Sequence, residues 1–267
     1  MNIQWLLNRA ILASLLISNI FATSPCLVNC DEPCERACSF NIELHGGVVP
    51  TIWAGRGGDC TNQGDRLPSF HNLFKIPFIV GGKVGWNYNE CSEIFVQVDY
   101  VQARGKCGSF SINCPSSVNG NAVIASGIGR YSAIGFWVGS RYYFNIDCVC
   151  RALSFFAGLQ VGFVQHRQID ISLSATSNVG TAAASCHPMF LRTTTISGGG
   201  HFGLDLCLTP CFSLVLTGAV IGNGAIRNYP VICLETALPG INSTTVLVGR
   251  YQTELWFPIT LGLKFTY

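Results

Sequence analysis

A few side chains of this sequence could carry proton-transfer chemistry. Glu43 and His45 lie on either side of a single leucine, and His166 begins a long polar segment. A carboxylate near an imidazole is a pair used in general acid–base catalysis. Neither histidine has a nucleophile at a recognisable spacing, and the Gly-x-Ser-x-Gly, Walker and His-Glu-x-x-His motifs are absent from the sequence. We therefore predict that the chain is not an enzyme and that it needs no cofactor.

Cysteine is the second residue type with chemical potential. The sequence contains 14 cysteines, far more than a cytosolic protein keeps without metal or catalytic duties. Because paired Cys-x-x-Cys knuckles are absent, we expect no metal site and favour disulfides in an oxidising compartment. The candidates are Cys107 with Cys114, which enclose a short segment containing Gly108, and the closely spaced Cys207 and Cys211.

The composition excludes some classes of function. With 16 Lys and Arg against 14 Asp and Glu, the net charge is only +2, which argues against a basic nucleic-acid-binding face. Charged residues make up 11% of the chain, against roughly 25% in soluble domains, and hydrophobic residues make up 49%. Such a composition favours a protein that is surrounded largely by something other than water.

The N-terminus indicates export. Arg9 precedes an apolar run over 10–21, and Ala22 offers a small residue for cleavage. This run is too short to span a bilayer as a helix, and no later apolar stretch reaches the length that a transmembrane helix needs. We assign 1–22 as a signal peptide, 23–38 as a Cys-rich periplasmic N-terminal segment and 39–267 as one β domain.

The end of the chain shows the strand pattern most clearly. Apolar Ile259, Leu261 and Leu263 alternate with small or polar residues such as Thr260 and Gly262, as in a strand with one apolar face. Seven further segments alternate in this way: 40–52, 76–87, 94–100, 134–145, 153–163, 196–206 and 212–222. Short links near 88–92, 147–151 and 207–211 alternate with long ones near 54–75, 104–132, 166–192 and 224–254. The sequence therefore predicts an all-β, eight-stranded, antiparallel up-and-down barrel.

The polar faces of these strands indicate which side lines the interior. They carry many glycines and few charges, which fits a narrow crowded lumen better than a wetted exterior. Acidic and basic side chains nearly balance on these faces, so we predict a lumen network of ion pairs. The predicted members are Glu43, His45, Lys83, Asp99, Arg141, His201, Asp205 and Lys264. Aromatic residues cluster near the short turns, as at a membrane–water boundary. The barrel is therefore predicted to be transmembrane, with its apolar face toward lipid.

The strand count, the alternation of short and long links and the final strand resemble the small eight-stranded outer-membrane barrels of Gram-negative bacteria. In that family the C-terminal strand with its terminal aromatic residue is the signal read by the barrel-assembly machinery. The resemblance implies that Phe265 and Tyr267 carry this signal and that the chain lies in the bacterial outer membrane. The implied partners are outer-membrane lipid and the assembly machinery.

The segment 31–38, just ahead of the first strand, is similar to the Cys-rich entry of the major outer-membrane proteins of chlamydiae and legionellae. Their envelopes are stiffened by disulfides between proteins. On the barrel scheme nine cysteines fall at the periplasmic end and five in the outer loops, so each side leaves an odd thiol. One alternative is that this thiol bonds an envelope protein. The other is that all disulfides are internal links within loops and turns, and that the odd thiol on each side is unused.

We therefore expect a structural or surface barrel with a narrow or salt-bridge-closed lumen. A porin-like channel for small solutes and an outer-membrane lipid-modifying enzyme that uses His166 are the alternatives.

Overall fold

The computed structural model describes residues 39–54, 73–106, 110–112, 122–145, 153–177, 180–209, 211–226 and 252–267. The predicted signal peptide at 1–22 and the Cys-rich segment at 23–38 lie outside these residues. No helix in these ranges is long and apolar enough to cross a membrane.

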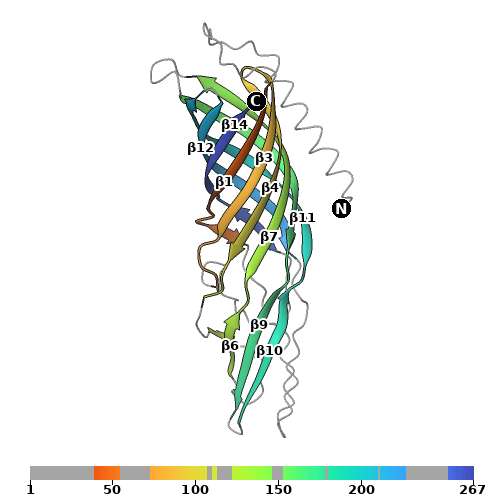
Figure 1. Ribbon diagram of the computed structural model, residues 1–267. Helices are drawn as coiled ribbons and strands as arrows, with labels where there is room; N and C mark the ends of the chain where they lie inside the picture. The colour runs from red at the N-terminus through yellow and green to blue at the C-terminus, as the bar shows by residue number, and fades with distance from the viewer. Residues whose placement is uncertain are drawn as a thin grey trace, which may run out of the picture.

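Eight antiparallel strands form a closed wall (Figure 1). They are β1 (Ser39–Val48), β3 (Phe78–Asn89), β4 (Ser92–Ala103), β7 (Tyr131–Asn145), β8 (Leu153–His166), β11 (Thr193–Thr209), β12 (Phe212–Ile226) and β14 (Ile259–Thr266). Each strand pairs with the next in this order, and β14 pairs with β1 from Asn41 opposite Thr266 to Val48 opposite Ile259. A closed sheet leaves no unpaired edge, which is what a β-protein needs in hydrocarbon. The predicted eight-stranded up-and-down barrel is confirmed.

The first and last strands are each interrupted once at the seam where they meet. After Pro50 the chain resumes as β2 (Ile52–Ala54), and β13 (Gln252–Trp256) precedes the break at Pro258. β13 pairs with both β2 and β12, so the wall continues beyond the breaks. Proline has no backbone N–H to donate to a ladder, which explains why the regular pairing stops at these two residues.

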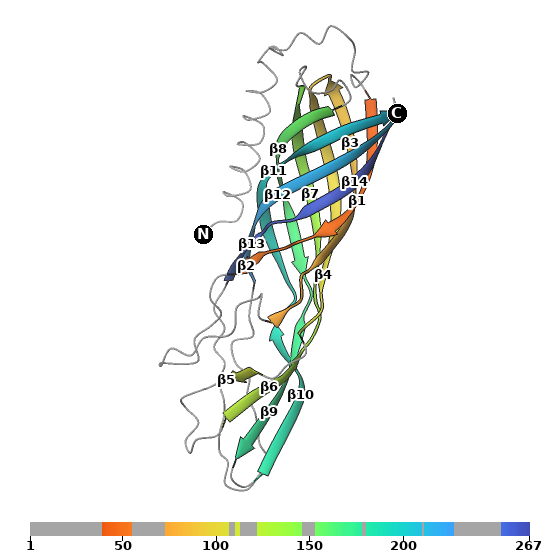
Figure 2. The same cartoon turned by 90° about the vertical axis from the view of Figure 1, so that its left-hand side faces the viewer.

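Parts of two long links form a second sheet, which extends beyond the barrel (Figure 2). It contains β5 (Phe110–Ile112), β6 (Ala122–Ile128), β9 (Ile169–Ser177) and β10 (Gly180–Phe190), and we call it the projecting sheet. The predicted long links over 104–132 and 166–192 are present, but the strands within them were not predicted. Apolar and polar residues alternate along β9, as in other strands. Along β10 a run of small Ala and Ser residues gives little contrast between the two faces.

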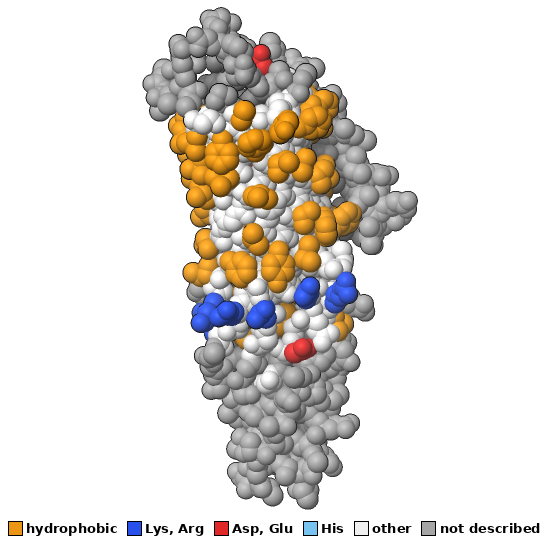
Figure 3. Space-filling view, in the orientation of Figure 1, with side chains coloured by type: hydrophobic (Ala, Val, Ile, Leu, Met, Phe, Trp, Pro, Cys, Tyr) orange, Lys and Arg blue, Asp and Glu red, His pale blue; other side chains and the backbone are white. Residues whose placement is uncertain are grey.

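The apolar face of the strands points outward. Along β14 every second residue from Ile259 to Phe265 is exposed, and those between, up to Lys264, are buried. Apolar side chains cover the outside of the barrel in a broad band (Figure 3), while polar side chains line the inside. A barrel that is apolar outside and polar inside is a transmembrane barrel, as predicted.

Aromatic residues border the band at the short-turn end. Ring pairs there include Phe40 with Trp86 at 6.3 Å and Tyr142 with Phe144 at 4.8 Å between centroids. Amphipathic aromatic rings prefer the boundary between hydrocarbon and headgroups. The predicted aromatic cluster is therefore present, although exposed Phe136 shows that aromatic residues are not confined to this end.

A charge placed on the lipid side tests this orientation. Val96 is 57% exposed midway along β4, and Val96→Arg should destabilise the barrel by about 2–4 kcal/mol, because the charge meets the middle of the hydrocarbon. Ile76 is 63% exposed and adjoins Lys75 just ahead of β3, so Ile76→Arg should cost only about 0–1 kcal/mol. Denaturant unfolding in lipid vesicles measures both. Equal costs would contradict the lipid-facing assignment.

Candidate functional site: the lumen of the barrel

The structure buries all the charged residues that the sequence assigns to the lumen. Because successive side chains of a strand point to opposite faces, the polar residue next to each outward apolar residue points inward. Each of these side chains is at most 6% exposed: Glu43, His45, Lys83, Asp99, Arg141, His201, Asp205 and Lys264.

Glu43, on β1, is the centre of the charge network. Its Oε2 accepts a hydrogen bond of 2.9 Å from Arg141 Nη1 and forms an ion pair with Lys83 Nζ. Its Oε1 lies 3.7 Å from His45 Nδ1. One carboxylate thus meets cations from two other strands, β3 and β7. In a low-dielectric interior an unpaired charge costs several kcal/mol, on the order of the net free energy of unfolding of a whole protein. This pairing is therefore needed for stability.

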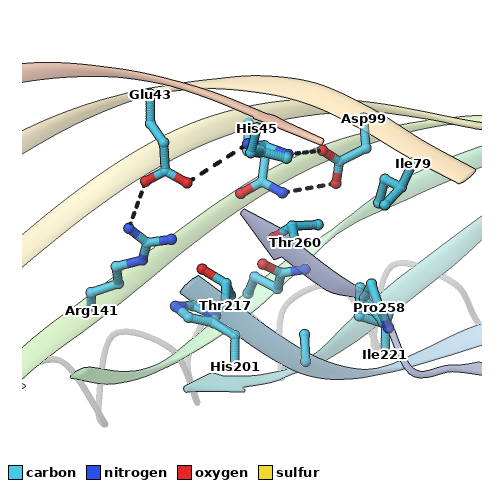
Figure 4. A pocket seen from close by; sticks show the side chains of 13 residues that line it. Glu43, His45, Ile79, Asp99, Arg141, His201, Thr217, Ile221, Pro258 and Thr260 are labelled. Atoms are coloured by element: carbon cyan, nitrogen blue, oxygen red, sulfur yellow. Dashed lines mark hydrogen bonds and ion pairs between the residues drawn. The ribbon is translucent and has the colours of Figure 1, made fainter. Parts of the chain in front are cut away.

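On one side the network continues to Asp99. His45 Nε2 lies 2.8 Å from Asp99 Oδ1, and Gln97 Nε2 donates to Asp99 Oδ2 at 2.8 Å (Figure 4). The imidazole therefore bridges two carboxylates, Glu43 and Asp99. The pairing of Glu43 with His45 that resembled acid–base chemistry in the sequence is part of a buried structural network.

On the other side the network crosses to β11 and β14. Lys83 Nζ lies 3.8 Å from Glu93 Oε1, and the Tyr143 hydroxyl donates to Glu93 Oε2. Lys264 donates to the same hydroxyl at 3.5 Å and forms an ion pair with Asp205. Glu93 and Tyr143 are not among the members predicted from the sequence. Both could have been found, because Glu93 shares the strand parity of Asp99, and Tyr143 that of Arg141.

Aromatic rings pack against the cations of the network. The guanidinium carbon of Arg141 lies 4.3 Å from the Phe156 ring centroid and 5.6 Å from that of Phe95, and Lys83 Nζ lies 5.2 Å from the Phe95 ring. The His201 ring is 5.4 Å from that of Phe95. Within the described ranges, neither ring nitrogen of His201 has a hydrogen-bond partner. Cation–π contacts of this kind stabilise desolvated cations by about 2 kcal/mol.

Glycines on the inner face make room for the network. A Cβ atom added to Gly81 would collide with the Asp99 carboxylate and the His45 ring, and one added to Gly158 would collide with His201. The small residues that suggested a narrow interior thus lie directly beside inward polar side chains.

A small cavity lies beside the network. Polar Gln97, Gln160, Thr217 and Thr260 line it together with network residues (Figure 4). It offers about 30 Å³ of space for the centres of water molecules, room for about two of them. A space of this size can hold water beside the network.

An apolar cluster lies in the half of the barrel interior nearer the long loops. Trp137 and Trp256 are buried there with Phe74, which comes from the link before β3. The Phe74 and Tyr131 ring centroids are 5.9 Å apart. This apolar cluster forms a second level of buried side chains, beside the charge network.

His166 belongs to this second level. Its Nδ1 lies 3.3 Å from the Tyr131 hydroxyl and its Nε2 lies 3.4 Å from Thr195 Oγ1. The Tyr131 hydroxyl also donates to Glu254 Oε2 at 3.2 Å, and Trp256 Nε1 donates to the same oxygen at 2.9 Å. His166 is 2% exposed and points inward, so it does not face lipid.

Of the four cysteines predicted to form disulfides, two lie in the described residues. Cys207 and Cys211 lie near the β11–β12 turn as thiols, half-buried and exposed respectively, and they are not bonded to each other. Cys107 and Cys114 lie outside the described residues. Across the described ranges, no group of three or more His, Cys, Asp or Glu residues is placed to hold a metal ion.

Comparisons with known proteins concern the fold. No family model matches the chain, and no curated protein sequence matches it. OprG of Pseudomonas aeruginosa, an outer-membrane protein, is 12% identical, with 87% of this chain and 97% of that chain covered and a TM-score of 0.45. Neisserial surface protein A is 11% identical, with 85% and 96% covered and a TM-score of 0.38. The outer-membrane protease OmpT of Escherichia coli is 10% identical, with 86% and 97% covered and a TM-score of 0.37. The closed eight-stranded wall described above bears out the fold that the resemblance to small outer-membrane barrels implied, while the resemblance to chlamydial and legionella proteins stays a prediction.

Breaking one ion pair tests the network. Lys264→Met should destabilise the barrel by about 3–5 kcal/mol, because it leaves the Asp205 carboxylate buried without its cation. Adding Asp205→Asn should restore much of that stability, since no buried charge then lacks its partner. Denaturant unfolding of the two variants in the same lipid measures the difference. Additive losses in the double variant would contradict the pairing.

Proposed function

We propose that this protein is a structural barrel of the bacterial outer membrane that holds a surface-exposed β-sheet and whose lumen is closed to solutes. The observation that carries the proposal is the filling of the lumen at two levels, by the network around Glu43 and by the apolar cluster around Trp137. The alternation of the final strand and its exposed Phe265 and Tyr267 support assembly into the outer membrane.

The width of the barrel supports closure. The interior of an eight-stranded barrel is just wide enough for its own side chains to fill. Here Arg141, from β7, reaches Glu43 on β1 and the Phe156 ring on β8, so side chains from separated parts of the wall meet across the interior. A porin-like pathway would have to pass both this level and the apolar one.

The projecting sheet supports a surface role. β9 follows β8 after only Arg167 and Gln168, and β10 ends at Phe190, shortly before β11 begins. Gly129 N donates to Asp170 O at 2.7 Å, joining the segment between β6 and β7 to β9. The projecting sheet is therefore joined directly to the barrel wall. Such an attachment suits a sheet that makes contacts outside the membrane. The inward position of His166 gives no support to lipid modification.

Planar-bilayer recording tests the closed lumen. The wild-type barrel should show no stepwise conductance, and Arg141→Ser should stay silent, because the apolar cluster still closes the second level. Combining Arg141→Ser with Trp137→Ala and Trp256→Ala should open a path and give discrete steps. The variant with only the two Trp substitutions is the matched control for loss of bulk.

Stepwise conductance from the wild-type protein would overturn the proposal in favour of the channel. Each preparation should first show the heat-modifiable gel mobility of a folded barrel, so that silence is not caused by unfolding.

We further propose that the thiol of Cys211 is available to an envelope protein. It is exposed in the β11–β12 turn at the short-turn end, whereas that of Cys207 is half-buried with its Sγ 3.1 Å from Thr209 O. On a non-reducing gel of native envelopes, Cys211→Ser should remove at least one high-mass band that reducing agent also removes. Cys207→Ser is the matched control and should keep that band. An unchanged pattern in Cys211→Ser would show that the turn takes no part in crosslinking.

A further inference from the structure

One buried carboxylate of the barrel interior lacks a basic partner. Glu254 lies on β13 and is 1% exposed. The other buried carboxylates of the described ranges each form an ion pair with a basic side chain: Glu43, Glu93, Asp99 and Asp205. Glu254 forms no ion pair with any Lys, Arg or His of these ranges. Because an uncompensated charge in a protein interior is strongly destabilising, this carboxylate requires a partner that the described side chains do not supply.

Neutral donors hold the Glu254 carboxylate in place. The Tyr131 hydroxyl and Trp256 Nε1 both donate to its Oε2, at 3.2 Å and 2.9 Å. The hydroxyl has a single proton, so it can only accept from His166 Nδ1, which lies 3.3 Å away. The imidazole thus orients the hydroxyl and does not neutralise the carboxylate. Both contacts end on Oε2, so the carboxylate keeps the acceptor capacity of Oε1.

Three polar side chains lie in one row across the inner wall. Ser197 on β11 is opposite Asn223 on β12, and Asn223 is opposite Glu254 on β13. β13 adjoins β12 at the long-loop end of the wall (Figure 2). All three residues are at most 3% exposed and therefore point inward. Residues opposite each other on antiparallel strands have Cβ atoms about 4.5–5.5 Å apart, so the row gathers a hydroxyl, an amide and a carboxylate.

The neutral members of this row have oxygens without partners. Within the described ranges, neither Ser197 Oγ nor Asn223 Oδ1 has a hydrogen-bond partner, and both atoms are buried. Buried polar atoms in native proteins are nearly always satisfied, and an exception indicates a bound water or ion. Oxygens of this kind beside an uncompensated carboxylate are the ligands that a hard metal cation prefers.

Charge balance selects the class of cation. The carboxylate of Glu254 brings one negative charge, and the other two members of the row are neutral. A monovalent cation makes the site neutral, whereas a divalent one would leave a positive charge uncompensated next to the apolar cluster around Trp137. Protein oxygens can replace the hydration shell of a monovalent cation, as carbonyl groups do for K⁺ in channels.

We propose that the side-chain oxygens of Ser197, Asn223 and Glu254 bind a monovalent metal cation, Na⁺ or K⁺. The cation would join β13 to β12 and β11, just beyond the break at Pro258, where the pairing of β12 with β13 has a register shift. The site needs the folded barrel, but it depends neither on whether the lumen conducts nor on Cys211. The proposal can therefore fail independently of the proposed function, which is tested by conductance.

Unfolding by urea in vesicles of neutral lipid tests the proposal, because guanidinium would itself supply a cation. The wild-type barrel is compared at a pH of about 8, where an ordinary histidine is neutral, in chloride salts of Na⁺, K⁺ and N-methyl-D-glucamine. Each salt is used at about 150 mM, which keeps the screening equal. Na⁺ or K⁺ should lower the unfolding equilibrium constant at least about tenfold relative to the bulky organic cation, as a free cation at ten times its dissociation constant does.

Two variants locate the effect. Glu254→Gln keeps an acceptor for Tyr131 and Trp256 but removes the charge, so its unfolding constants in the three salts should agree within about twofold. Asp170→Asn is the matched control, because it removes an exposed carboxylate at the same end of the barrel. This control should keep the tenfold difference between salts.

Equal stability of the wild-type barrel in the three salts would overturn the proposal, whether or not the variants fold. A cation effect that persisted in folded Glu254→Gln would also overturn it, because the cation would then bind elsewhere. Stabilisation by calcium chloride but not by the sodium or potassium salt would overturn the assignment to a monovalent cation.

Discussion

A sheet that closes on itself in hydrocarbon leaves its charged side chains only one place to lie. The outer face must be apolar along its whole height, so strand alternation directs Glu43, Lys83 and Arg141 into an interior only eight strands wide. There they cannot be hydrated as at a surface, and each must find an opposite charge. The ion pairs are thus a consequence of the closed sheet, and their side chains occupy its interior.

Much of the fold could be predicted because alternation is a local rule. The residues between Ile259 and Phe265 show which side of the strand meets lipid without any knowledge of the neighbours. The same parity places Lys264 inside. Which inward residues touch could not be predicted in this way. Tyr143 meets Glu93 because of the stagger between strands, a property of the closed barrel that no single segment contains.

The least predictable parts are those where the chain departs from simple alternation. Phe74 lies in a link that carries no strand pattern, yet it packs against Tyr131 within the lumen. The strands β9 and β10 consist largely of small Ser, Thr and Ala residues, which weaken the contrast between faces. The breaks at Pro50 and Pro258 are visible as prolines, but their position at one seam follows only from the pairing of the first and last strands.

The near-continuous passage from β8 to β9 and from β10 to β11 has a mechanical consequence. Only Arg167 and Gln168 separate the first two strands, and Leu191 and Arg192 the second two. A pull on the projecting sheet is therefore transmitted lengthwise into paired strands of the wall, so that many interstrand hydrogen bonds bear the load together in shear. Such an attachment transmits force to the wall more directly than a flexible tether would.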